Sequence, residues 1–171
     1  MKRPVTRAAL VLFVFAYTAW SAASIRSNIE IGTLLEFGTA AFRSGVTESA
    51  ERAAYAALAG NAIARFIAYP LLLLGGIVFV ATTELSIRRN GWLLMSAILL
   101  FLFVPVELYC FWLDWKLVGL QYWGSWPLEE FRKALLARVT ALAGLPFIAQ
   151  LCYYTIPFLV LFRPLRTPAE R

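Results

Sequence analysis

The 171-residue chain contains no histidine and only two cysteines. Histidine is the commonest metal ligand, the usual haem ligand and the usual general base, so its absence argues against those kinds of site. Cys110 and Cys152 both lie in apolar stretches and form no Cys-x-x-Cys motif. They are more typical of small buried side chains than of a redox or zinc site. The sequence therefore predicts no metal and no cofactor.

Recognisable catalytic motifs are also missing. The chain has no phosphate-binding glycine loop, no His-Glu-x-x-His, no nucleophile elbow and no pair of carboxylates within one apolar stretch. These absences favour a protein that is not an enzyme.

Charge is scarce as well: 15% of the residues are charged and 61% are hydrophobic, whereas soluble domains carry about 25% charged residues. The apolar residues form blocks, which indicates a membrane protein rather than a large soluble core. The net charge is +6, but the basic residues flank the apolar blocks instead of forming one polar face. Membrane topology explains them better than nucleic-acid binding does.

Four blocks are long enough to cross a bilayer as helices: Ala8 to Ile25, Phe66 to Leu85, Trp92 to Leu113 and Ala141 to Phe162. Twenty helical residues span the ~30 Å hydrocarbon core, and continuous apolar runs do not fit the alternating pattern of a barrel. We predict an all-α integral membrane protein of one domain, residues 1–171, with its four helices in an up-down bundle.

The basic residues predict the orientation of this bundle. Three clusters fall on one side if there are four crossings, and this side is expected to be cytoplasmic: Lys2, Arg3 and Arg7; Arg88 and Arg89; Arg163, Arg166 and Arg171. Both termini are then inside, and a bacterial inner membrane is the expected location. A cleaved signal peptide is the alternative for the first block, because small residues follow a basic start and an apolar middle. We favour a retained anchor.

The two outer connections, 26–65 and 114–140, are predicted to form a helical head outside the membrane. Thr47 fits an N-cap, so the second helix is expected to begin near Glu48. In the other connection Ser125 or Trp126 fits a cap and Pro127 a first helical position. The residues that follow form one apolar face, and we expect this helix to continue into the fourth span with a kink at Pro146.

Three polar residues are unusual in this setting. Glu107 is expected about 7 Å inside the outer boundary, at a depth that matches Arg65. Because buried charges between membrane helices need partners, we favour a structural Glu107–Arg65 pair, or a protonated Glu107 with local hydrogen bonds. The alternative is a carboxylate that handles protons or cations. Gln150 on the fourth span is expected to bond across helices rather than to bind a substrate.

An aromatic stretch, Phe111 to Trp126, is the most unusual segment. Its candidate interface residues are Trp112, Trp115, Tyr122, Trp123 and Trp126. An interfacial belt is the simplest interpretation, since indole rings favour the headgroup zone. A platform that docks a neighbouring membrane subunit is the second, because these residues are enriched at interface hot spots. A shelf for lipid or quinone is the third.

Our functional hypothesis is a small accessory or scaffolding subunit of a larger membrane complex. Its partners would be membrane lipids and other membrane subunits, or copies of itself, and not nucleic acid. The first alternative is a small transporter or channel subunit that uses Glu107 and Arg65. The second is a membrane enzyme that acts on lipid.

Overall fold

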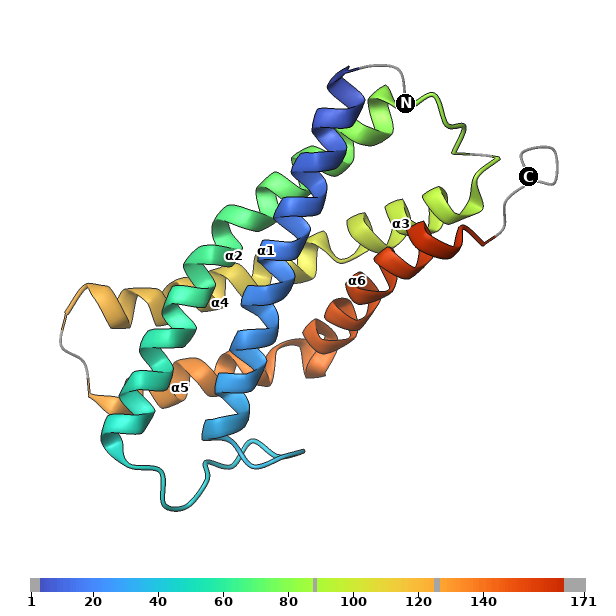
Figure 1. The fold of residues 1–171 in the computed structure, drawn as a ribbon. Coiled ribbons are helices and arrows are strands. Elements are labelled where there is room, and N and C mark those ends of the chain that lie inside the picture. Colours follow the sequence, from blue (N-terminus) through green and yellow to red (C-terminus); the bar gives the residue numbers. More distant parts are fainter. Residues whose placement is uncertain (1–3, 88, 125–126, 165–171) are drawn as a thin grey trace.

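The computed structural model describes residues 4–87, 89–124 and 127–164. Throughout these residues the chain is helical, apart from connecting segments and one isolated bridge between Leu35 and Phe42. Four helical segments are long and apolar enough to cross a membrane, as the four blocks predict (Figure 1). Each of the four includes or overlaps a predicted span.

Helices α1 (Pro4–Leu34) and α2 (Glu48–Thr82) form the first hairpin. They run antiparallel, because Thr6 near the start of α1 hydrogen-bonds to Thr82 at the end of α2. The N-cap at Thr47 is confirmed, with its side chain accepting a hydrogen bond from the backbone N–H of Ala50. At 1.5 Å per residue, these 31- and 35-residue helices are about 46 and 52 Å long, so both exceed the hydrocarbon core.

The third crossing segment contains a break that the sequence analysis does not predict. Helix α3 (Gly91–Leu102) and helix α4 (Val104–Tyr122) meet at Phe103. Pro105 explains the break, since a proline removes one helical hydrogen bond and its ring clashes with the carbonyl four residues earlier. Beyond this point α4 continues well past the predicted end of the span at Leu113.

The last segment consists of α5 (Leu128–Val139), a short 3-10 turn η1 (Ala141–Gly144) and α6 (Leu145–Phe162). The predicted amphipathic helix is present, and Phe131 and Leu135 are its buried residues. The predicted continuous helix with a kink at Pro146 is wrong. The backbone breaks earlier, where residues 142–144 adopt positive φ, and Pro146 lies in the first turn of α6, where proline is tolerated.

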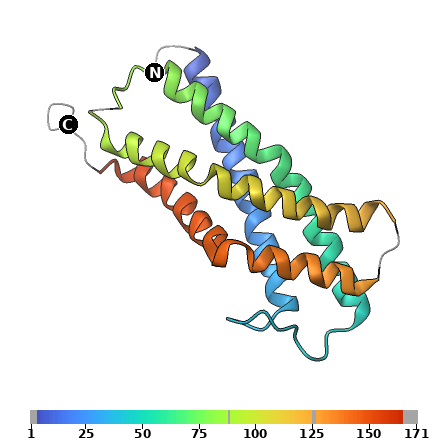
Figure 2. The same ribbon diagram turned by 180° about the vertical axis from the view of Figure 1, so that it is seen from behind.

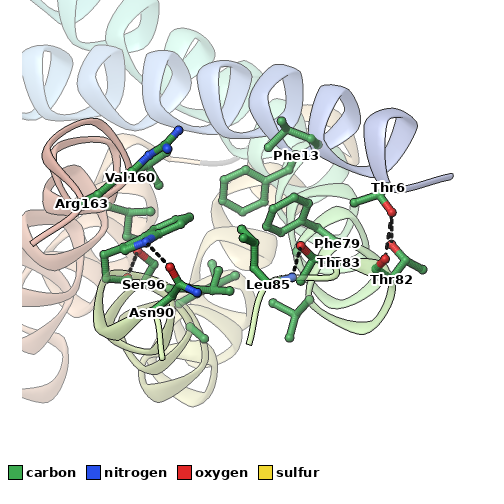
Figure 3. Close-up of a pocket in the computed structure, with 18 of the residues that line it drawn as sticks. Thr6, Phe13, Phe79, Thr82, Thr83, Leu85, Asn90, Ser96, Val160 and Arg163 are labelled. Carbon is green, nitrogen blue, oxygen red and sulfur yellow. Dashed lines mark hydrogen bonds between the residues drawn. The ribbon is translucent and has the colours of Figure 1, made fainter. Parts of the chain in front are cut away.

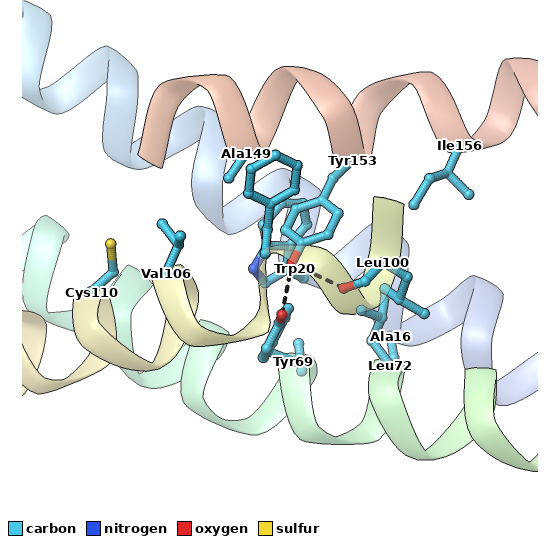
Figure 4. Close-up of a cluster of buried hydrophobic side chains, with 12 residues drawn as sticks. Ala16, Trp20, Tyr69, Leu72, Leu100, Val106, Cys110, Ala149, Tyr153 and Ile156 are labelled. Carbon is cyan, nitrogen blue, oxygen red and sulfur yellow. Dashed lines mark hydrogen bonds between the residues drawn. The ribbon is translucent and has the colours of Figure 1, made fainter. Parts of the chain in front are cut away.

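The second hairpin pairs α3 with α6 and α4 with α5, and it crosses the first hairpin at mid-length (Figures 1 and 2). At the crossing, Trp20, Tyr69 and Tyr153 are almost fully buried in the main core (Figure 4). The hydroxyls of Tyr69 and Tyr153 are 2.7 Å apart, and the rings of Trp20 and Tyr153 meet edge to face.

The two ends of the molecule differ. A second core fills what we call the head end, where α5 and the first turns of α2 lie, and Leu34, Tyr55, Phe131 and Leu135 belong to it. We call the opposite end, where α1 begins and α6 ends, the terminal end. There the two hairpins diverge in both views.

Candidate functional site

A cluster of buried charges lies between α2, α4 and α5. Asp114 on α4 is its centre: the Oδ2 atom of Asp114 is 2.9 Å from Nη2 of Arg65, and its Oδ1 accepts a hydrogen bond of 3.0 Å from Nε of Arg138. The side chains of Arg65 and Asp114 are each 4% exposed. A pair this deeply buried holds two helices in register, because neither charge can be exposed to solvent without separating them.

Glu107 lies two helical turns before Asp114 on α4 and is 2% exposed. Arg65 and Arg138 are close enough to act electrostatically on its carboxyl group. In the described part of the chain, however, the Glu107 side chain forms no hydrogen bond and no ion pair. The cluster thus contains two carboxyl groups and two guanidinium groups.

The structure therefore gives Arg65 a partner other than the expected Glu107. The third span was expected to end at Leu113, which would put Asp114 in the outer connection. Because α4 is longer than expected, Asp114 instead packs against α2 at the level of Arg65. Arg138 of α5 completes the cluster. The signal was present in the apolar i, i+3, i+4 pattern that continues from Leu113 to Leu117 and Leu120.

Gln150 joins helices as expected. Its Oε1 accepts a hydrogen bond of 2.8 Å from Nδ2 of Asn28, which connects α6 to α1. Both residues border a cavity of about 20 Å³ that Arg65 and Asp114 also line. The space beside the buried ion pair is therefore about the size of one water molecule.

A second ion pair joins α2 to α5 at the head end. Glu51 on α2 is buried and accepts hydrogen bonds of 2.7 and 2.6 Å from Nε and Nη2 of Arg132 on α5. The hydroxyl of Tyr55 donates to the same carboxylate. The Glu51 carboxylate raises the pKa of Arg132 above its ordinary value, mainly through these hydrogen bonds. Glu129 and Lys133 also pair, at 3.6 Å on the exposed side of α5.

The predicted aromatic residues lie on the outside of α4. We call Trp112, Trp115, Tyr122 and Trp123 the aromatic face, and each is about half exposed. Trp126 lies outside the described residues. Nζ of Lys116 is 3.8 Å from the centre of the Trp112 ring, a cation–π contact.

Gly119 leaves room for the Trp123 ring to pack over α4. A Cβ atom at Gly119 would lie 3.2 Å from the Trp123 ring, so a side chain there would displace that ring. Trp123 folds back over Gly119 and meets Trp115 edge to face, with 5.0 Å between the ring centres. Trp115 in turn contacts Phe66 of α2. The rings therefore form a connected surface across the seam of α2 and α4.

Metal binding has no candidate among the described residues, since no three carboxylate or cysteine side chains gather there in a suitable group. Comparison with family models, with curated proteins and with solved structures finds no match to this chain. The function must therefore be argued from the site itself.

Proposed function

We propose that this protein is a small accessory subunit of a larger complex in the bacterial inner membrane, with both termini in the cytoplasm and the head end outside. One observation carries the proposal: Arg65 and Asp114, charged residues of two crossing segments, are buried and paired with each other, while the aromatic face is turned outward. A partner membrane protein would bind the aromatic face, and lipid would cover the rest of the membrane-facing surface.

The buried charges favour this role over transport. A transported ion or proton needs a continuous polar path that reaches its binding carboxylate. Glu107 lines neither the space of about 20 Å³ beside the buried ion pair nor a cavity of about 550 Å³ at the terminal end, and Arg65 is held by Asp114. This arrangement suits a fixed structural core.

The length of the aromatic face supports a protein partner in addition to a headgroup belt. From Trp112 to Tyr122 the helix rises about 15 Å. The headgroup layer on each side of a bilayer is only about 5–8 Å thick. Trp112 and Tyr122, both about half exposed, are thus about twice that distance apart along α4, and such exposed aromatic residues resemble the anchors of an interface.

A separate face of α2 offers a site for close helix packing. Ala53, Ala57, Gly60 and Ala64 recur at spacings of four and three, and none of them is buried in the protein's own core. No atom of another described element lies within 4 Å of a Cβ placed on Gly60. Small residues let two helices approach closely, so we propose that a helix of the partner packs against this face.

The test is site-directed photocrosslinking in the native membrane. A photoreactive residue is placed at Gly60 or Trp115, and a matched one is placed at Phe15, an exposed residue of α1. We expect one discrete protein adduct from the first two positions and none from Phe15. Lipid adducts alone from all three positions, together with a monodisperse chain in mild detergent, would contradict the proposal.

A second variant links the adduct to the complex. Gly60→Leu fills the space for the partner helix without disturbing the core, because nothing in the chain contacts that position. We expect the partner to be lost on purification of Gly60→Leu and kept with Phe15→Leu.

A further inference from the structure

A cavity of about 550 Å³ opens between the two hairpins at the terminal end (Figure 3). Residues from α1, α2, α3 and α6 line it. Its volume lies within the range of about 300–1,000 Å³ that is typical of small-molecule sites. It is far larger than the 20 Å³ space beside the buried charges, so it needs an explanation of its own.

The lining of this cavity changes from apolar to polar along its length. The part near the crossing is made of residues such as Leu10, Phe13, Leu100 and Ile156. Gly76 lets the Leu100 side chain pack directly against α2 in this part of the wall, since a Cβ there would lie 2.9 Å from Cδ2 of Leu100. At the other extreme the lining residues belong to the helix ends and the connection after α2, and they include Thr83 and Asn90. An amphiphile has the same arrangement, with an apolar chain at one end and a polar group at the other.

Two opposite charges line the polar part. Arg163 immediately follows the last residue of α6, and Glu84 lies two residues after the end of α2. Both are exposed. Because they stand where the apolar segments end, they lie at the level expected for lipid headgroups.

The position of Arg163 is fixed by its surroundings. Its backbone adopts the left-handed conformation, with φ 45°, which ends α6. Its guanidinium lies 5.8 Å from the centre of the Trp92 ring, and Figure 3 shows this side chain beside Val160. Nε1 of Trp92 donates to Oδ1 of Asn90, so the ring under the guanidinium is itself held. A guanidinium in such a place is suited to a phosphate group.

We propose that this cavity binds a zwitterionic phospholipid through one of its acyl chains. The chain occupies the apolar part, the phosphate contacts Arg163, and the ammonium group contacts Glu84. A purely anionic headgroup would satisfy Arg163 but would also face the carboxylate of Glu84. This site is independent of the proposed partner surface, since it involves neither the aromatic face nor the small-residue face of α2.

The test measures lipid binding to the full-length protein in detergent micelles by native mass spectrometry. Three probes share one palmitoyl chain: lysophosphatidylethanolamine, lysophosphatidylglycerol and monopalmitoylglycerol. We expect the first to bind best and the uncharged third to bind least, by about tenfold, because charge-assisted hydrogen bonds to phosphate are worth at least that factor. Equal binding of all three would overturn the proposal and leave only nonspecific occupation by an acyl chain.

Variants locate the headgroup contacts. Arg163→Gln should reduce binding of both phospholipids to the level of monopalmitoylglycerol, and Arg163→Lys should restore part of it. Glu84→Gln should abolish the preference for the ethanolamine lipid over the glycerol lipid. Arg26→Gln, an exposed arginine on the other half of α1, is the matched control and should change nothing. Unchanged binding in Arg163→Gln would contradict the proposed phosphate contact.

One further variant locates the chain. Ala97 lines the cavity, and Ala97→Trp should fill it and abolish binding of all three probes. Ala8→Trp places the same ring on the exposed side of α1 and should bind like the unmodified protein. Full binding by a monodisperse Ala97→Trp would show that the lipids bind elsewhere and would overturn the proposal.

Discussion

The two ends of this molecule are held together by different means. At the head end, two ion pairs join the hairpins: Glu51 with Arg132, and Arg65 with Asp114. Asp114 also pairs with Arg138 within the second hairpin. At the terminal end, the polar contacts described above join helices of the same hairpin, as Thr6 does with Thr82. The hairpins are therefore fixed to each other at one end and separate around a cavity at the other. In this protein the buried ion pairs lie at the end where the two hairpins are fixed to each other.

Replacement of Asp114 should have the largest effect, because it weakens the attachment of the two hairpins at the head end. Asp114→Ala removes the carboxylate that both Arg65 and Arg138 contact, and the loss of one partner from a buried pair costs about 3–5 kcal/mol. We expect a decrease of that size in the free energy of unfolding, measured by denaturant titration in mixed micelles. Glu48→Ala, which breaks an exposed pair with Arg52, is the control and should cost less than about 1 kcal/mol. Similar costs for the two variants would show that the buried cluster does not hold the head end.

A substitution at Gly75 tests the packing of α1 against α2, the two helices of the first hairpin, which extend from the head end to the terminal end. A Cβ at this position would lie 2.9 and 3.0 Å from backbone atoms of Phe13 and 3.2 Å from the carbonyl oxygen of Ala9. Backbone cannot turn away as a side chain can, so Gly75→Ala should destabilise by about 1–3 kcal/mol. Gly60→Ala has open space and should stabilise the helix by up to about 1 kcal/mol. Effects of the same sign would contradict this account of α1–α2 packing.

The smallest effect is expected at the crossing. Tyr69→Phe removes the hydroxyl contact with Tyr153, while Tyr153 keeps its hydrogen bond to the carbonyl oxygen of Leu100. We expect a loss of about 1 kcal/mol in the same titration. Tyr122→Phe, at an exposed hydroxyl, should be neutral. A cost near that of Asp114→Ala would move the main point of attachment from the head end to the crossing.

Much of the fold follows from local chemistry and was predictable. Hydropathy indicates four crossing segments, and the start of α2 follows from Thr47 and the acidic first turn. The breaks were harder to predict. Pro105 and Pro146 both follow apolar residues, so hydropathy alone gives no sign of a helix break there. Residues 142–144 adopt positive φ, although only one of them is glycine. Such turns depend on tertiary packing more than on local preference.

The candidate site was predictable only in part. Glu107, Arg65 and Gln150 were identified because a polar group inside an apolar run is conspicuous. The partner of Arg65 was not identified, since a pairing between α2 and α4 depends on the crossing angle and on where α4 ends. The cavity was missed entirely. Its lining residues are ordinary span residues, and only the divergence of the two hairpins separates them.

The central rings have a consequence for movement through the molecule. Leu100 and Ile156 belong both to the wall of the large cavity and to the core around Trp20. The cavity therefore ends against these packed residues at about the middle of the molecule. Entry of an acyl chain from the bilayer would depend on how far α3 and α6 separate from α1 and α2.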